Sequence, residues 1–137
     1  MPQTTDVPTT SVPDLDAIRA QVLTAATAAS SRKATDIAIL EVGPLLGITD
    51  YFLLLSTGNE RQLDAALDEL EGRLRIEHRR KPIGREGLKE SGWVVLDYGD
   101  FVVHGFTTEQ RAVYDLERLW RDAGRVPFTD PESPAEG

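Results

Sequence analysis

The sequence contains no cysteine and only two histidines. The absence of cysteine excludes disulfide bonds, thiolate metal ligands and a cysteine nucleophile, and it favours either a reducing compartment or indifference to redox conditions. His78 and His104 lie on different predicted elements, without H-E-x-x-H or another ligand spacing, which argues against a transition-metal site. Long apolar runs are also missing, because the longest, Phe52–Leu55, is far shorter than the about 20 residues that cross a bilayer. We therefore expect no metal, no cofactor and no membrane span.

Positive charge is scarce as well. The 137 residues include 15 Lys and Arg against 23 Asp and Glu, which gives a net charge of −8. Broad, sequence-independent binding to nucleic acid needs a positive surface, so this balance argues against it. The length is typical of one domain, and we expect a soluble protein with a cytoplasmic location.

Both ends of the chain differ in composition from the middle. Residues 1–13 are rich in Pro and Thr, and the first basic residue is Arg19, so neither a secretory signal nor an Arg-rich transit peptide is expected. These residues predict a disordered arm. Residues 125–137 contain Pro127, Pro131 and Pro134 and predict a flexible C-terminal tail. The domain is therefore expected over residues 14–124.

Hydrophobic periodicity divides this domain into alternating helices and strands. The pattern predicts helices that begin near Asp14, Asn59 and Thr107, a strand pair at 37–42 and 51–57, and a second pair at 93–98 and 101–106. Residues 79–92 read as a polar, Gly-rich loop. The third helix is expected to bury a stripe made of Ala112, Val113, Leu116, Leu119 and Trp120. The order α-β-β-α-β-β-α predicts a single layered α+β domain.

The second strand pair is the most informative segment because only Gly99-Asp100 joins its strands. A glycine at the first turn position suits a type II′ hairpin, which fixes the register. One face should then be core. The other face, called here the outer face, carries Trp93, Val95, Asp97, Val102, His104 and Phe106. Two interpretations stay open: a helix buries this face and His104 bonds to Asp97, or the face docks a partner through aromatic anchors and a few polar groups.

Three other clusters contain residues capable of catalysis or ligand binding. A hydrolytic triad of Ser91 or Ser56 with His104 and Asp97 is disfavoured because neither serine lies in a G-x-S-x-G elbow. The junction of residues 56–59 could hold an anion at a helix start, although turn geometry and capping also explain it. A basic cluster is either a solvated helix end or a local RNA contact; it consists of Arg73, Arg75, Arg79, Arg80, Lys81 and Arg85.

Several segments together resemble one known family. They are D-I-A-I-L-E-V at 36–42, I-T-D-Y-F at 48–52, S-T-G at 56–58, E-G at 86–87, W-V-V-L-D-Y-G-D-F-V-V-H at 93–104 and Y-D-L-E-R-L-W at 114–120. In their order and spacing these motifs closely resemble the ribosomal silencing factor family, also called RsfS or Iojap-like. The resemblance runs from about the first helix to Asp122. Phe101 and Gly105 depart from it, since more aliphatic residues are usual at these positions.

The resemblance implies a fold like the nucleotidyltransferases, a mixed sheet flanked by helices, without their catalytic residues. It also implies a non-enzymatic translation repressor that acts when nutrients are scarce. Such a protein binds the large ribosomal subunit through ribosomal protein L-fourteen, blocks joining of the small subunit and forms homodimers off the ribosome. An acidic domain would approach a basic ribosomal protein with favourable electrostatic steering.

Site residues follow from the matching motif positions. The partner-binding residues implied by the resemblance are Trp93, Val95, Asp97, Tyr98, Asp100 and His104. A minor rRNA contact is expected at Arg79, Arg80 and Lys81. The alternatives are a nucleotide-binding or nucleotidyltransferase-type enzyme at the Thr57-Gly58 junction and an RNA chaperone that uses residues 73–85.

Overall fold

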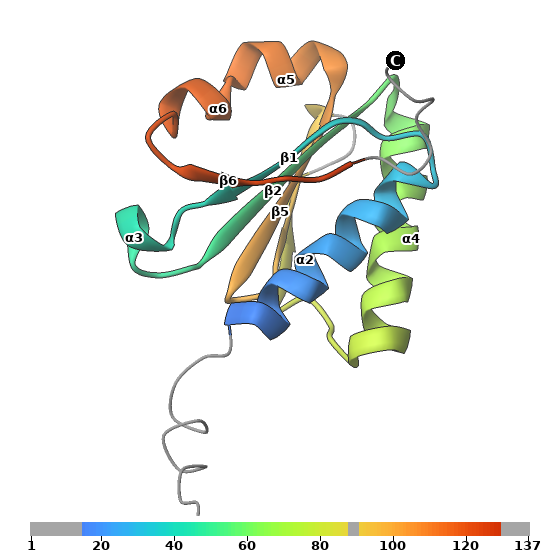
Figure 1. The fold of residues 1–137 in the computed structure, drawn as a ribbon. Coiled ribbons are helices and arrows are strands. Elements are labelled where there is room, and N and C mark those ends of the chain that lie inside the picture. The colour runs from blue at the N-terminus through green and yellow to red at the C-terminus, as the bar shows by residue number, and fades with distance from the viewer. Residues whose placement is uncertain (1–14, 88–90, 130–137) are drawn as a thin grey trace, which may run out of the picture.

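The computed structural model describes residues 15–87 and 91–129, and its centre is a six-stranded sheet (Figure 1). The helices are α2 (Leu15–Ser30), α3 (Gly43–Leu46), α4 (Glu60–His78), α5 (Thr108–Tyr114) and α6 (Leu116–Leu119). The strands are β1 (Thr35–Glu41), β2 (Tyr51–Thr57), β3 (Gly84–Glu86), β4 (Trp93–Asp97), β5 (Phe101–Thr107) and β6 (Gly124–Val126). The arm expected at residues 1–13 and most of the expected tail lie outside the described residues.

The sheet is mixed and its strands follow the order β3-β4-β5-β2-β1-β6. β2 and β5 run parallel, whereas the other neighbouring pairs are antiparallel. Helices α2 and α4 lie together against one face, and α5 and α6 lie on the other side (Figure 1). The expected α+β domain with a mixed, helix-flanked sheet is therefore confirmed.

The central strand β2 is covered on both faces. All seven of its residues are buried, which explains why its sequence is apolar without alternation. Leu53 and Leu55 belong to the core beneath α2 and α4, whereas Phe52 and Leu54 belong to a smaller core beneath α6. The continuous apolar run in the sequence therefore correctly predicts a central strand here.

Helix α4 begins and ends at residues that the sequence indicates. Its N-cap is Asn59, whose Oδ1 accepts a hydrogen bond of 2.8 Å from the Gln62 N–H. Its last turn is closed by Arg79, which adopts a left-handed conformation with φ of 56°. The stripe expected from the periodicity is fully buried; it comprises Leu63, Ala66, Leu67, Leu70 and Leu74. None of the helices in the described ranges has both the length and the apolarity to cross a bilayer.

The β4–β5 hairpin has the register predicted from its two-residue turn. Leu96 lies opposite Val103 and Val94 opposite Gly105, and the Tyr98 N–H donates to the Phe101 carbonyl across the turn. Gly99 has a φ of 89°, a conformation that a glycine adopts without strain. The face beneath α2 and α4 is core, as expected.

The prediction of one long third helix with a buried stripe is wrong. The helix stops at Tyr114, Asp115 adopts a φ of 29°, and a short second helix, α6, follows. Because the break changes the direction of the chain, Leu116 is buried while Val113 and Leu119 are 67% and 71% exposed. The predicted capping by Thr107 is confirmed, since its Oγ1 accepts from the Gln110 N–H.

Two short edge strands were not predicted. Within the expected loop 79–92, residues 84–86 form β3 and pair with β4, and Gly87 follows with a φ of 87°. A Cβ at Gly87 would collide with the Trp93 carbonyl oxygen, which accounts for a glycine here. At the other edge, β6 pairs with β1 and buries Val126, so the ordered part of the chain continues beyond the expected boundary at residue 124. Three-residue strands carry too little periodicity to be recognised from sequence.

Candidate functional site

The outer face of the hairpin is buried at one end and open at the other. Phe106 is fully buried and His104 is 8% exposed, whereas Val95, Asp97 and Val102 are half-buried. Trp93 stacks on Phe106 with ring centroids 5.3 Å apart and lies 4.4 Å from the ring of Tyr114 on α5. A helix pair thus covers one end of this face, as the burial interpretation predicts. The rest of the face is accessible, and docking of a partner there stays a prediction.

His104 bonds to Trp93 and not to Asp97. The indole Nε1–H of Trp93 donates to His104 Nδ1 at 3.2 Å. The Phe52 ring lies edge-on to the imidazole with centroids 4.7 Å apart. Burial lowers the pKa of His104 to about 4, so the ring is neutral at pH 7. The pairing of His104 with Asp97 in the core, one of the two expectations, is wrong.

The neutral His104 is not part of a hydrolytic triad. Its Nε2 has no hydrogen-bond partner among the described residues. Ser56 Oγ accepts a 2.7 Å hydrogen bond from Arg111, and Ser91 Oγ donates to the Trp93 carbonyl. No nucleophilic hydroxyl in the described chain is thus paired with the imidazole.

Asp97 is the last residue of β4 and Tyr98 follows it, and their side chains point to opposite faces, as successive residues of an extended chain do. Asp97 faces outward, is half-buried, and its Oδ1 accepts from the Gly99 N–H at 2.8 Å. Tyr98 is 1% exposed and faces the core, where its ring stacks on Phe101. Burial raises the pKa of Tyr98, so it is a neutral phenol. The expectation that Tyr98 contacts a partner is therefore wrong in this structure.

Asp100 is engaged by Arg80, which was an expected RNA contact. The Arg80 Nη2 lies 3.0 Å from Asp100 Oδ1 and 2.6 Å from the Tyr98 carbonyl oxygen. Its Nη1 donates to Gln21 on α2 at 2.7 Å. These bonds occupy both terminal nitrogens of the guanidinium, so Arg80 acts as an internal clamp. The negative charge of Asp100 is therefore neutralised by Arg80 of the same chain.

An apolar hollow of about 390 Å³ opens beside the accessible part of the outer face. Its walls include Leu46 at the end of α3, Phe52 on β2 and Val102 on β5. Ile48 and Ile83, which are 82% and 76% exposed, stand among its lining residues. Asp97, His104 and Thr49 supply the polar groups of the lining. We call this feature the hairpin hollow.

Sequence reasoning missed several contributors to the hairpin hollow. Ile48 and Thr49 stand in the I-T-D-Y-F motif, but no role was assigned to them. Ile83 was placed in a polar loop, and only the pairing of β3 with β4 brings it beside the hairpin. The signal that was available is an isoleucine in an otherwise polar segment, which is weak by itself.

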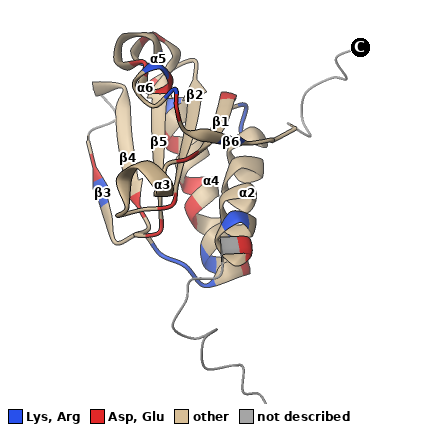
Figure 2. Cartoon of the chain, turned by 60° about the vertical axis from the view of Figure 1, so that its left-hand side comes forward, with Lys and Arg blue, Asp and Glu red and all other residues tan. Residues whose placement is uncertain are grey.

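The basic cluster separates into paired and unpaired cations. Arg73 bonds to Glu69, and Arg85 bonds to Asp64 and Glu71. Arg75, Arg79 and Lys81 are exposed, and no ion pair is formed by them within residues 15–87 and 91–129. Figure 2 shows basic residues gathered at the C-terminal end of α4 and along the segment that follows, while acidic residues are spread over several elements. Of the three expected RNA contacts, only Arg79 and Lys81 are free to make one.

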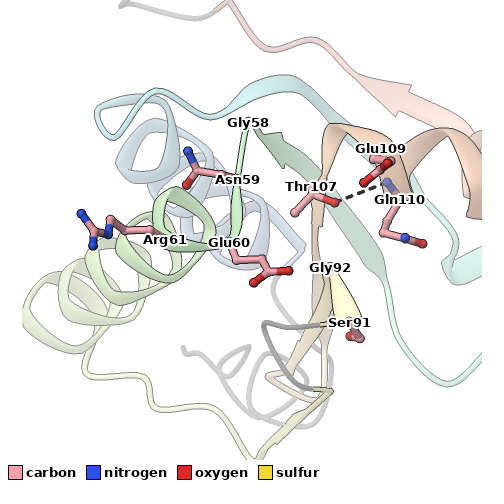
Figure 3. A pocket seen from close by; sticks show the side chains of 9 residues that line it. All are labelled: Gly58, Asn59, Glu60, Arg61, Ser91, Gly92, Thr107, Glu109 and Gln110. Atoms are coloured by element: carbon pink, nitrogen blue, oxygen red, sulfur yellow. Dashed lines mark hydrogen bonds between the residues drawn. The ribbon is translucent and has the colours of Figure 1, made fainter.

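A second hollow, of about 630 Å³, lies where α4 and α5 begin (Figure 3). Gly58 lines it, and this residue belongs to the Thr57-Gly58 junction at which the nucleotide-binding alternative is placed. Gln62 accepts from the Gly58 N–H through its side chain, so capping interactions account for the local geometry. The charged residues of its lining are Glu60, Glu109 and Arg61, so two carboxylates and one cation surround the hollow. In the described part of the chain, no three His, Asp or Glu side chains are grouped to hold a metal.

Comparison with known proteins identifies the family of this chain. The family model described as "Ribosomal silencing factor during starvation" matches residues 15–137. The chain belongs to the ribosomal silencing factor family. The resemblance inferred from the motifs is therefore confirmed.

Individual relatives support this assignment. The chain is 35% identical over 99 residues to the ribosomal silencing factor RsfS of Bacillus subtilis, a match that covers 72% of this chain and 83% of that protein. It is 37% identical over 105 residues to the chloroplastic protein Iojap of Zea mays, with 75% of this chain and 45% of that protein covered. A mouse relative, 34% identical over 89 residues, is named "Mitochondrial assembly of ribosomal large subunit protein 1"; the match covers 64% of this chain and 39% of that protein.

Solved structures show the same fold. A Chromobacterium violaceum protein superposes with a TM-score of 0.71 at 28% identity, covering 87% of this chain and 96% of that one. A Bacillus halodurans protein superposes with a TM-score of 0.67 at 30% identity, covering 80% and 99%. Sheet and flanking helices are thus shared with these proteins over most of their length.

Proposed function

We propose that this chain binds the large ribosomal subunit through the outer face of the β4–β5 hairpin and thereby prevents the small subunit from joining. The observation that carries the proposal is the half-open outer face, where Trp93 and Val95 remain partly accessible beside the hairpin hollow. Exposed isoleucines at a concave surface are typical of a protein-docking site. The family assignment supplies the ribosome as the place of action.

The charge of the domain favours a basic protein as the direct partner. The chain carries a net charge of −8, and Asp97 lies at the hollow. Ribosomal proteins embedded in RNA are normally basic, so the long-range field accelerates their encounter with this domain. Ribosomal protein L-fourteen, which the family resemblance implies, is the partner we propose. rRNA contributes at most a local contact at Arg79 and Lys81.

The mechanism requires occupancy and no chemical step. A folded domain on the joining surface excludes the small subunit sterically, so inhibition follows from two competing binding equilibria. In a cell this competition would repress translation when nutrients are scarce. We propose that the protein acts in the cytoplasm and forms a homodimer off the ribosome, for which sedimentation equilibrium across a concentration series is the test.

Sucrose-gradient sedimentation tests the proposal. The purified chain is incubated with isolated large subunits, small subunits are then added, and the gradient is analysed for free subunits and joined ribosomes. We expect the chain to migrate with large subunits and the joined peak to shrink as its concentration rises. A chain that binds large subunits but leaves joining unchanged at saturation refutes obstruction, and a chain that does not bind refutes the whole proposal.

A further inference from the structure

Geometry fixes which nitrogen of His104 carries the proton. The indole Nε1–H of Trp93 can only donate, so His104 Nδ1 must accept with its lone pair. A neutral imidazole that accepts at Nδ1 carries its hydrogen on Nε2. Trp93 therefore holds His104 in the tautomer that presents an Nε2–H donor.

This donor is one of two unpartnered polar groups at the hairpin hollow. His104 Nε2 and Thr49 Oγ1 are both buried without a hydrogen-bond partner in the described chain, and both residues line the hollow. Each residue is 8% exposed. The third buried atom of this kind, Tyr98 Oη, belongs to a residue that faces the opposite side of the sheet.

Unpartnered buried donors destabilise a free protein, because folding removes their bonds to water without replacing them. The neighbouring walls are apolar, and a phenylalanine and a valine at these two positions would suit them better. Two such groups at one hollow, next to two highly exposed isoleucines, point to a partner that completes the hydrogen bonds. Ile48 and Ile83 are 82% and 76% exposed. Few atoms of this chain cover their side chains, so a partner segment can contact them.

We propose that the hairpin hollow receives a segment of a protein partner whose main-chain carbonyl accepts the hydrogen bond of His104 Nε2–H, while an apolar side chain of that segment contacts Phe52, Ile48 and Ile83. Thr49 Oγ1 bonds to the same segment. This inference rests on the proposed docking function and deepens it, because it assigns His104 and Thr49 as the specificity-determining polar groups.

The surroundings favour a protein segment over RNA. A phosphate near the hollow would meet the Asp97 carboxylate, which lines it. The walls are aliphatic and aromatic, and Val102 and Leu46 offer no donor to a sugar or base. A peptide segment supplies both a carbonyl and an apolar side chain within a few ångströms.

Four variants test the inference. His104→Phe removes the donor and keeps a ring, whereas His104→Gln keeps an N–H donor near the Nε2 position. Thr49→Val removes the second polar group with little change of volume. Thr27→Val is the matched control for a Thr-to-Val change, because Thr27 is half-buried on α2, the helix that packs on the opposite face of the sheet.

Each variant is measured by co-sedimentation with purified large ribosomal subunits and by thermal unfolding, and the wild type and His104→Phe are also titrated with protein-free rRNA. We expect His104→Phe and Thr49→Val each to bind about tenfold more weakly, the effect of one lost hydrogen bond. Thr49→Val should unfold at or above the wild-type temperature, because it removes an unpartnered buried group. His104→Phe also leaves the Trp93 Nε1–H without its acceptor, which offsets the gain, so this variant should unfold near the wild-type temperature. His104→Gln should stay within about threefold of wild type, and Thr27→Val should bind like wild type.

The outcomes separate this inference from the docking proposal. If the wild type binds large subunits and folded His104→Phe and Thr49→Val bind equally well, the inference is wrong and the docking proposal stands. If His104→Gln binds as weakly as His104→Phe, the hydrogen-bond explanation is wrong. If protein-free rRNA binds with the same dependence on His104, the partner is not a protein segment. If the wild type fails to bind subunits, the docking proposal itself has failed.

Discussion

The Arg80 guanidinium bonds to both carboxylate oxygens of Asp100, at 3.0 Å to Oδ1 and 3.3 Å to Oδ2. The same side chain reaches the Tyr98 carbonyl and Gln21 on α2. Arg80 thus ties the segment after α4 to the hairpin turn and to α2. Because Asp97 and Gly99 sit at this turn, the clamp also fixes one border of the hairpin hollow.

Replacing Arg80 should destabilise the fold. Arg80→Met keeps much of the side-chain volume but leaves Asp100 and the Tyr98 carbonyl without their donor, which we expect to lower the free energy of unfolding by about 2 kcal/mol. Arg80→Lys should lose less, because one ammonium can satisfy some of these acceptors but not all. Chemical denaturation measures both. Arg79→Met is the matched control, since the exposed Arg79 side chain forms no ion pair in the described chain, and an equal loss in this variant would contradict the clamp.

Trp93→Ala should weaken binding to large subunits by about 2–4 kcal/mol, the range of a central aromatic anchor. The structure adds a second effect, because the Trp93 ring stacks on Phe106 and its N–H bonds to His104. The variant should therefore also unfold at a lower temperature, and binding must be measured well below its melting temperature. Trp93→Phe keeps most of the ring contact and should lose less binding. A fully folded Trp93→Ala variant that co-sediments like wild type would remove Trp93 from the site.

Asp97→Lys should impair binding through charge reversal while the domain remains folded. Asp97 is half-buried and accepts one hydrogen bond from the Gly99 N–H, so its loss should lower the free energy of unfolding by only about 1 kcal/mol. Asp97→Asn is the control, because its amide oxygen can still accept from Gly99 but carries no charge. Weaker binding in the order wild type, Asn, Lys, together with cooperative melting of all three, is the expected result. Equal binding of the Lys variant would show that no cation of the partner lies near this position.

The exposed cations after α4 should contribute a small, salt-sensitive part of the affinity. Arg79→Ser combined with Lys81→Ser removes two cations that no carboxylate compensates in the described chain. If both contact rRNA phosphates, the slope of log affinity for large subunits against log salt should fall by about 1 for each. Affinity is measured by sedimentation from low to moderate salt. An unchanged slope would mean that docking is made by protein contacts alone.

Most of the fold could be predicted from the sequence where periodicity was long and local. Helix α4, its cap at Asn59 and its buried stripe were all predicted, because nineteen residues give several repeats of the pattern. The prediction of the third helix was wrong for a physical reason. Asp115 leaves the helical conformation, so the residues before and after it do not share one helix face. Strand β6 is held by pairing with the distant β1, and the three-residue strand β3 is held by pairing with β4. A local pattern reveals neither pairing.

The candidate site was only half predictable. The hairpin turn fixed which residues share the outer face, and motif matching pointed to Trp93, Asp97 and His104. Whether His104 bonds to Trp93 or to Asp97 depends on side-chain rotamers and on the cover supplied by Phe52, and neither is encoded in spacing. Tyr98 shows the opposite error, since its place in a motif suggested a contact that its burial prevents.

Acidification should destabilise the domain through His104. Burial lowers the pKa of His104 in the folded state to about 4, from an ordinary value near 6.5 in the unfolded chain. As the pH falls below about 6.5, the unfolded chain takes up a proton on His104 while the folded chain does not. The stability of the folded state is therefore unaffected by this histidine above about pH 6.5 and is progressively reduced by it towards about pH 4. Between these limits the free energy of unfolding should fall by about 1.4 kcal/mol per pH unit.

The His104→Phe variant isolates this effect from the carboxylates that also titrate at low pH, and His78 is present in both proteins. Urea denaturation of both chains at pH 7.5, 6, 5 and 4.5 gives the comparison. The gap in unfolding free energy should widen in favour of the variant as the pH falls. Parallel pH profiles would show that His104 accepts a proton in the folded state, which would contradict its burial as a neutral donor and with it the tautomer that Trp93 imposes.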